Sequence, residues 1–304
     1  MMIIRPRPHI FKLFFVMQGS ILPKIAPQLI AIFLLSVTVV LAHYFFPNIV
    51  PTYNSASAFT MLGIALSVFL GFRNNACYDR WWEGRIIWGK IVSSSRDLIR
   101  QTYLFSDRIN ERHAFLYLTS AFSFSLAYDL KNSKAIPEAL LELNFKINDE
   151  YLKTHNKPSF ILNCLAQKLV ALYKKKLITD IQFQMIDKTL ERLNESQVAC
   201  ERLKTTPVPF PYTLLLHRTA YIFCFLIPFG FNDILGWWTP VASLFVAYTL
   251  FGLDAISEEM EQPFAPVKNA LPICAMATLV ARDIYAQTGK KMPEAIEPIN
   301  YVLQ

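Results

Sequence analysis

Charged residues are scarce in this sequence. Of its 304 residues, 17% are charged and 53% are hydrophobic, whereas soluble domains usually carry about 25% charged residues. Much of the surface must therefore face something other than water, which indicates a lipid bilayer. The net charge of +7 could favour nucleic acid, but the basic residues are scattered and flank apolar stretches, a pattern typical of membrane topology. We expect the bilayer as a partner, and no nucleic acid.

Motifs for catalysis and metal binding are also absent. The sequence contains no glycine-rich phosphate loop, HExxH, EF-hand loop or GxSxG elbow. Its five histidines lie far apart and its five cysteines form no CxxC pair, which argues against a zinc site and a disulfide framework. We therefore expect no enzyme, no cofactor and no metal site.

A first stretch without any formally charged side chain runs from Lys24 to Arg73. A membrane-spanning helix needs about 20 apolar residues, so this stretch has room for two spans and a turn. Poor helix formers mark the turn within residues 47–55. We place the spans near 27–46 and 56–75.

A second apolar region begins around Tyr212. Residues 219–232 and 234–253 are free of charge, and Asn232-Asp233 is expected to form the turn between them. Two further spans fit, near 213–231 and 236–258. All four should be helices, because an isolated strand in lipid would leave its backbone groups unpaired.

Basic residues flank these spans on one side only. The connections 47–55 and 232–235 contain no Lys or Arg, so positive-inside reasoning places both termini and the middle region in the cytoplasm. The basic residues also interrupt the N-terminus, so no cleavable signal peptide is expected. They are Arg5, Arg7, Lys12, Lys24, Arg73, Arg80, Arg85 and Lys90.

The middle region holds most of the polar sequence. Its apolar residues recur at helical spacing, as in Ile178, Ile181, Met185 and Ile186, and the chain has only 9 glycines. We expect an all-α membrane protein with four transmembrane helices. The expected organisation is a cytoplasmic segment 1–24, helices one and two in 25–76, a helical cytoplasmic domain 77–204, helices three and four in 205–260, and a cytoplasmic segment 261–304.

The second span places Ile64, Val68 and Phe72 at positions i, i+4 and i+8, on one narrow helix face. From the pattern alone, such a stripe more often indicates helix–helix packing than a pore. The helix should continue beyond the membrane, because no breaker appears before Gly84.

Several segments resemble the bestrophin family of ion channels, most closely its bacterial branch. The second span and the residues after it resemble the family's pore helix and its Arg-Trp-Trp motif. Residues 206–212 resemble the segment that enters the third span, and the end of the fourth span and its linker match as well. The matching residues are Ser67, Leu70, Gly71, Phe72, Arg80, Trp81, Trp82, Gly252, Glu258, Pro263 and Phe264.

The resemblance implies a homopentamer around a central pore, in a bacterial inner membrane. Carried over by position, a hydrophobic neck corresponds to Ile64, Val68 and Phe72. A narrower cytosolic aperture corresponds to Ile181, with Ile178 as the alternative registration. Helix packing around the pore falls to Ser67 and Gly71, and a structural anchoring role to Arg80, Trp81 and Trp82.

The chain departs from the eukaryotic members at two places. Residues 265–270 contain a lysine and no carboxylate where those members bind calcium, so no calcium activation is expected. Val68 and Ala65 stand where they have phenylalanine and proline, two residues that favour anions through an aromatic edge and exposed backbone N–H groups. We expect small monovalent cations, Na⁺ or K⁺, to permeate; a chloride channel and a secondary transporter are the alternatives.

Charged groups at the span ends allow simpler interpretations. His217 and Arg218 are expected to anchor the third span at the interface rather than line an ion pathway. Asp254, the only carboxylate placed to suggest a transporter site, is interpreted as a helix-end residue, and Glu258, Glu259 and Glu261 as a solvated helix end.

Overall fold

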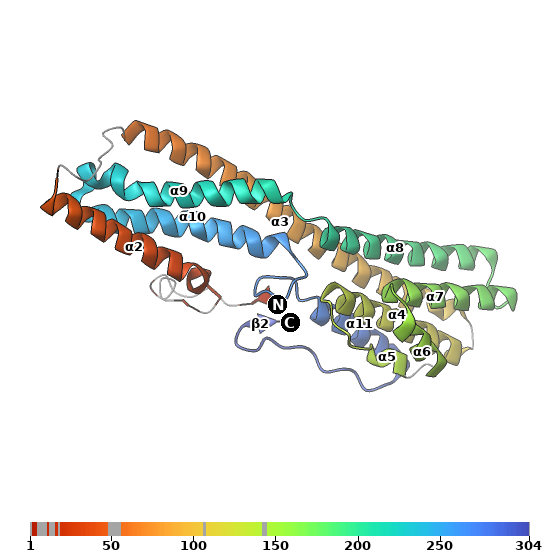
Figure 1. The fold of residues 1–304 in the computed structure, drawn as a ribbon. Helices are drawn as coiled ribbons and strands as arrows, with labels where there is room; N and C mark the ends of the chain where they lie inside the picture. The colour runs from red at the N-terminus through yellow and green to blue at the C-terminus, as the bar shows by residue number, and fades with distance from the viewer. Residues whose placement is uncertain are drawn as a thin grey trace. The chain divides into compact units, whose positions relative to one another are not determined.

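The computed structural model describes residues 2–4, 11, 16–17, 19–47, 56–105, 108–141 and 145–303. The predominantly helical fold that the sequence predicts is confirmed; the exception is an antiparallel pair of two-residue strands, β1 (Met2–Ile3) and β2 (Val302–Leu303). The helices are α2 (Leu22–Phe45), α3 (Ala56–Gln101), α4 (Ile109–Leu130), α5 (Glu138–Leu141), α6 (Phe145–Lys153), α7 (Lys157–Lys174), α8 (Asp180–Thr205), α9 (Phe210–Leu235), α10 (Thr239–Glu261) and α11 (Ile273–Thr288), with the 3-10 helices η1 (Thr102–Phe105) and η2 (Gly236–Trp238) (Figure 1).

The chain divides into two compact units, and one division falls within α3. Unit 1 consists of Met1–Arg5, Trp81–Thr206 and Gln262–Gln304, and unit 2 of Pro6–Arg80 and Pro207–Glu261. The divisions after residues 80, 206 and 261 lie close to the boundaries that the charge pattern predicts after 76, 204 and 260. That unit 2 lies in the membrane and unit 1 in the cytoplasm stays a prediction.

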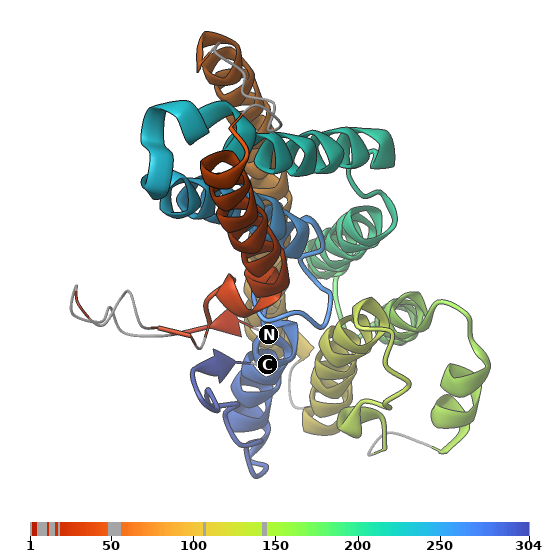
Figure 2. The ribbon, with the colours of Figure 1, turned by 60° about the vertical axis from the view of Figure 1, so that its left-hand side comes forward.

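Unit 2 contains helices that are apolar on every side. Helix α2 packs side by side with α9 and α10 (Figures 1 and 2) and buries Leu29 and Ile32 against them. On its opposite side Ile30 and Leu34 are exposed, and so is Phe245 of α10. A helix that is apolar all round is typical of a large core or of lipid. The outer face of unit 2 therefore suits hydrocarbon better than water.

Exposed aromatic residues gather where α2 ends and where α9 turns into α10. The rings of Tyr44 and Trp237 lie 5.9 Å apart, centroid to centroid, and Phe45, Phe46 and Trp238 are exposed beside them in sequence. Tyr and Trp are enriched at the two membrane–water interfaces. This group has the composition of such an interface belt.

Two stretches of the described residues are long and apolar enough to cross a membrane. They are Leu22–Phe45 and Phe210–Glu261, and the second, at 52 residues, comprises α9, η2 and α10. A span needs about 20 residues, so this second stretch has the length for two crossings.

The turn between the third and fourth predicted spans lies later than the sequence suggests. Asn232 and Asp233 lie inside α9, and the prediction that they form the turn is wrong. The chain turns instead at Gly236, whose φ of +49° favours glycine, and its N–H donates to the Asn232 carbonyl. The other predicted connection, 47–55, lies outside the described residues from 48 onward, as do Arg5, Arg7 and Lys12.

Unit 1 is organised around α4, which packs against α7 and α11. From Phe115 to Ser123 every residue of α4 is buried. The hydroxyls of Thr119 and Ser123 donate to carbonyls of their own helix, as Thr119 does to Phe115 at 3.1 Å. Helix α8 begins with a capping box in which Thr179 and Gln182 satisfy each other's backbone N–H. The predicted helical block is thus a packed helical core.

Close packing of α3 on α9 gives a first testable prediction. A Cβ built on Gly230 would lie 2.6 Å from the ring of Phe59. Gly230→Ala should therefore destabilise the protein, because overpacking costs about 1–3 kcal/mol and outweighs a gain in helix propensity of about 1 kcal/mol or less. Thermal unfolding in detergent measures this.

The matched control is Gly252→Ala in α10. Its added Cβ would meet the side chains of Ile21 and Ile25 at 3.9 and 4.0 Å, which is ordinary contact. Its melting temperature should match the wild type or exceed it. Equal effects of the two substitutions would contradict the packing explanation.

Candidate pore-lining face

Helix α3 has two distinct faces in unit 2. One face is buried and carries Leu66, Leu70, Arg73 and Cys77, which follow one another at spacings of four, three and four residues. Leu66 and Leu70 belong to the apolar cluster that also contains Phe223 of α9. This face holds α3 against the rest of its own unit.

The other face carries the three residues predicted to form the neck. Ile64, Val68 and Phe72 are 61%, 48% and 61% exposed. The structure thus brings all three onto one uncovered apolar face. They do not pack against the described part of their own chain as a core stripe would, so this face is free to contact another chain, lipid or a pore.

The two small residues predicted to pack around the pore lie on α3 as well. Ser67 Oγ donates to the carbonyl oxygen of Gly63 at 2.8 Å, so its hydroxyl is satisfied within the helix. A Cβ built on Gly71 would meet nothing within 4 Å in the described part of the chain. Any close helix approach at Gly71 must therefore come from another molecule, and this role stays a prediction.

The Arg-Trp-Trp motif lies where the two units divide. In unit 2, Arg80 Nε donates to the backbone carbonyl of Glu261 at 3.1 Å. In unit 1, Trp81 Nε1 donates to the carbonyl of Asn269 at 2.9 Å and packs against the apolar core. Trp82 is exposed. These bonds agree with a structural rather than a conducting role for Arg80 and Trp81.

The two candidate aperture residues differ sharply in burial. Ile178 is buried in the core of unit 1, whereas Ile181, in the first turn of α8, is 80% exposed. A side chain enclosed by the core cannot face an ion. Of the two, only Ile181 has an exposed side chain, and its place at an aperture stays a prediction.

A group of charged residues that the sequence did not bring together lies on the buried side of α3. Arg73 is 1% exposed, and its Nη1 pairs with Oδ1 of Asp254 on α10. The other carboxylate oxygen of Asp254 lies 2.7 Å from Nδ1 of His217 on α9. We call Arg73, Asp254 and His217 the triad.

The triad corrects two interpretations. Asp254 is a buried acceptor inside α10, so the helix-end interpretation is wrong, and His217 bonds to Asp254 rather than serving only as an interface anchor. A signal was present in the sequence: Leu250, Phe251 and Asp254 share one side of α10 at helical spacing, as Leu66, Leu70 and Arg73 do in α3. Opposite charges on two buried faces predict a pair.

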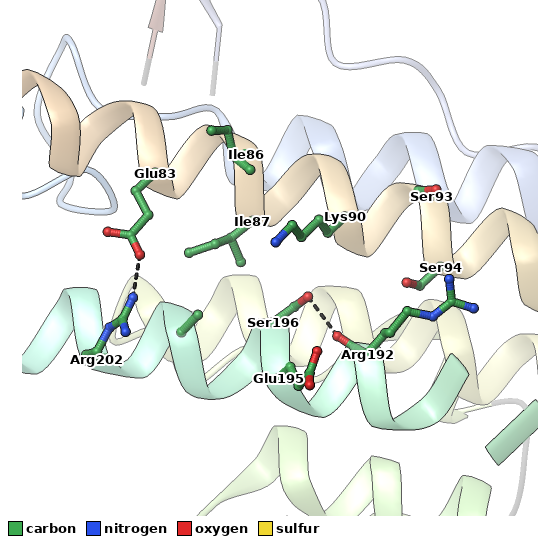
Figure 3. Close-up of a pocket in the computed structure, with 11 residues that line it drawn as sticks. Glu83, Ile86, Ile87, Lys90, Ser93, Ser94, Arg192, Glu195, Ser196 and Arg202 are labelled. Carbon is green, nitrogen blue, oxygen red and sulfur yellow. Dashed lines mark hydrogen bonds and ion pairs between the residues drawn. The ribbon is translucent and has the colours of Figure 1, made fainter. Parts of the chain in front are cut away.

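Unit 1 has a groove of about 490 Å³ between α3 and α8 (Figure 3). Charges of both signs line it, and some are paired: Glu83 with Arg202, and Arg192 with Asp97 at 3.4 Å. Lys90 and Glu195 also line it. With its charges largely offset, the groove presents no concentrated field of one sign.

Neither catalysis nor metal binding is evident among the described residues. No group of three or more His, Cys, Asp or Glu that could hold a metal ion occurs there. Burial raises the pKa of the Cys164 and Cys200 thiols above their usual value, so both stay protonated and poorly nucleophilic. Residues 265–270, which the resemblance matches to the calcium-binding stretch of the eukaryotic members, lie within a turn that the Leu271 N–H closes by donating to the Pro263 carbonyl oxygen at 2.8 Å.

Sequence comparison finds one family model across most of the chain. The bacterial and fungal bestrophin family matches residues 2–286. A voltage-dependent anion channel-forming protein of Mesorhizobium japonicum is 35% identical over 295 residues, which cover 97% of this chain and 95% of that protein. The voltage-dependent anion channel-forming protein YneE of Salmonella typhimurium is also 35% identical, over 95% of each chain.

Comparison with solved structures gives the same family. A bacterial bestrophin homologue from Klebsiella pneumoniae matches with a TM-score of 0.84 at 32% identity, covering 88% of this chain and 99% of that one. A variant of that homologue with the mutation L177T matches with a TM-score of 0.82. Both likenesses extend over nearly the full length of the known chain.

Proposed function

Because this chain belongs to the bestrophin family, whose members are membrane ion channels and not enzymes, we propose that five copies of it form a channel for small monovalent ions through a hydrophobic neck. The observation that carries this proposal is the exposed apolar face of α3. Ile64, Val68 and Phe72 repeat along that face and have no cover from the described part of their own chain.

Several copies are needed to use this face as a pore. A single chain has too few helices to surround an aqueous path, whereas five copies of α3 could enclose one. The three residues would then form stacked apolar rings about 6 Å apart, given a rise of about 1.5 Å per residue. An apolar constriction gates by dewetting, because an ion must keep its water or lose hydration energy.

Unit 1 would add the second constriction on the cytoplasmic side. Ile181, in the first turn of α8, has an exposed side chain, which suits a ring of five such residues. The belt of Tyr44 and Trp237 suits a membrane–water interface, and the connection between α9 and α10 contains no Lys or Arg, which supports an orientation in which that connection faces outward. Both termini would then lie in the cytoplasm, beneath a bacterial inner membrane.

The assembly can be tested directly. Purified protein in detergent should have a protein mass of five chains of 34.9 kDa each, as measured by size-exclusion chromatography with light scattering. The family resemblance and the uncovered face of α3 both lead to this expectation. A monomer or dimer at channel-forming concentrations would contradict it.

We propose cations as the permeant ions. The neck offers no aromatic edge at Val68, and Asp79 is an exposed carboxylate on α3 seven residues after Phe72, two turns further on the same side. Five such carboxylates would concentrate cations beyond the neck. The names of the relatives from Mesorhizobium and Salmonella favour the second candidate, an anion channel.

A reversal potential separates these candidates. With KCl higher on one side of a planar bilayer, the current through wild-type protein should reverse near the potassium potential. Asp79→Asn should move the reversal potential toward zero, because the ring loses its charge, while Glu294→Gln, an exposed carboxylate after α11, should not. A wild-type reversal at the chloride potential would establish the anion channel instead.

A further inference from the structure

Asp254 ties three helices of unit 2 together through its two carboxylate oxygens. Arg73 Nη1 of α3 pairs with Oδ1, and His217 Nδ1 of α9 lies 2.7 Å from Oδ2. Nη2 of Arg73 also lies 3.8 Å from Oε2 of Glu261, seven residues further along α10. Arg73 therefore has a second carboxylate within reach if its bond to Asp254 weakens.

His217 is the most exposed member of the triad. Its side chain is 48% exposed, against 1% for Arg73 and 11% for Asp254. Histidine is the side chain that changes charge between about pH 5 and 8. Protonation would place a second positive charge on Asp254, opposite Arg73.

His217 has neighbours on its own helix α9 and on the other helices of unit 2. Its ring stacks on Tyr221 at 4.4 Å between centroids, and the Tyr221 hydroxyl accepts from Gln28 of α2 at 3.4 Å. The charged and titratable groups near the triad's end of the unit 2 helices are Lys24 on α2, Arg73, Cys77, Tyr78, Asp79 and Arg80 on α3, Tyr212, Arg218 and Tyr221 on α9, and Asp254, Glu258, Glu259 and Glu261 on α10.

Arg73 of the triad adjoins a residue of the proposed neck. Phe72 precedes Arg73 in α3 and lies on the exposed face, whereas Arg73 lies on the buried one. A bond that draws Arg73 toward α10 therefore draws the neck-lining face away from the axis of a pore. A weaker bond lets that face move back.

We propose that Asp254, through Arg73, positions the Phe72 end of the neck, and that protonation of His217 weakens this hold and narrows the channel. The imidazolium repels Arg73 and competes for the same carboxylate, and Glu261 is the other acceptor that Arg73 can use. Current therefore falls as the pH falls. This inference rests on the proposed channel function.

Currents in planar bilayers test the switch. Wild-type current should fall about five-fold or more between about pH 8 and pH 5.5, within the usual range of allosteric coupling. His217→Gln keeps an N–H donor for Asp254 but cannot be protonated, so its current should be the same at both values. His43→Gln is the control, since His43 lies 3.8 Å from Asp233 in another part of unit 2, and it should keep the wild-type response.

A readout that needs no current separates this inference from the channel proposal. With a fluorinated phenylalanine at position 72, the ¹⁹F resonance should shift with pH in the wild type and stay fixed in His217→Gln. If this pH-dependent shift occurs but the protein carries no current, the channel proposal is contradicted and the coupling of His217 to Phe72 is supported. A conducting protein whose pH response survives His217→Gln, or whose current rises in acid, overturns the switch.

Discussion

Val68→Asn should raise the ion current several-fold or more. Val68 is the middle residue of the exposed apolar face of α3, so one substitution would change five side chains at the centre of the neck. An amide in each subunit gives water hydrogen-bonding partners where the wild type has none, which lowers the cost of wetting the constriction. Single-channel recording should show a higher open probability, because the wet state becomes the more stable one.

The chain offers a control with the same chemical change. Val241 of α10 is 54% exposed, close to the 48% of Val68, but lies on a different helix. Val241→Asn places the same polar amide on an exposed face of unit 2, so its cost to stability should be similar. It should leave the current per assembled channel unchanged. If both variants conduct alike, or if Val68→Asn conducts as the wild type does, the neck is not the barrier.

The local chemistry of this sequence was enough to predict its helices. The stretch without charge from Lys24 to Arg73 favours long apolar helices, and nearly all of α2 and residues 56–73 of α3 lie there. The turn before α10 was misplaced because Asn232 and Asp233 are tolerated in a last helical turn, whereas Gly236 adopts a backbone angle that few other residues accept. The sequence does not distinguish a glycine that adopts a positive φ from one that lies within a helix, so the position of this turn could not be predicted.

Part of the candidate site could be predicted from local sequence, and part of it could not. The face formed by Ile64, Val68 and Phe72 follows from helical periodicity and is exposed, whereas its role as a pore neck stays a prediction. The triad does not follow from periodicity, because its members are separated by 144 and 37 positions in the chain (217 − 73 and 254 − 217). In the sequence, Arg73 indicates membrane topology and Asp254 a helix end, but each is a buried charge, and a buried charge is stable only with a partner.

Arg73→Ala should cause the largest loss of stability among the substitutions considered. The side chain is almost completely buried and supplies the guanidinium for Asp254, with Glu261 close by. Removing one partner of a buried pair costs about 3–5 kcal/mol, because the other charge is left without compensation. His217 still bonds Asp254, so the loss should lie toward the lower end. Unfolding in detergent, followed by circular dichroism, measures the change in free energy.

Two variants show whether the loss comes from the uncompensated charge. Arg96→Ala removes an arginine whose side chain is 57% exposed and pairs with Asp283 at 2.8 Å, and exposed pairs contribute only about 0–1 kcal/mol. The double variant Arg73→Met/Asp254→Leu removes both charges and keeps the volume, so it should recover most of the stability. It should also lose the pH response that depends on Asp254. If Arg73→Ala unfolds no more easily than Arg96→Ala, the pair does not hold α3 in place, and the position of the neck must be set by apolar packing at Leu66 and Leu70 alone.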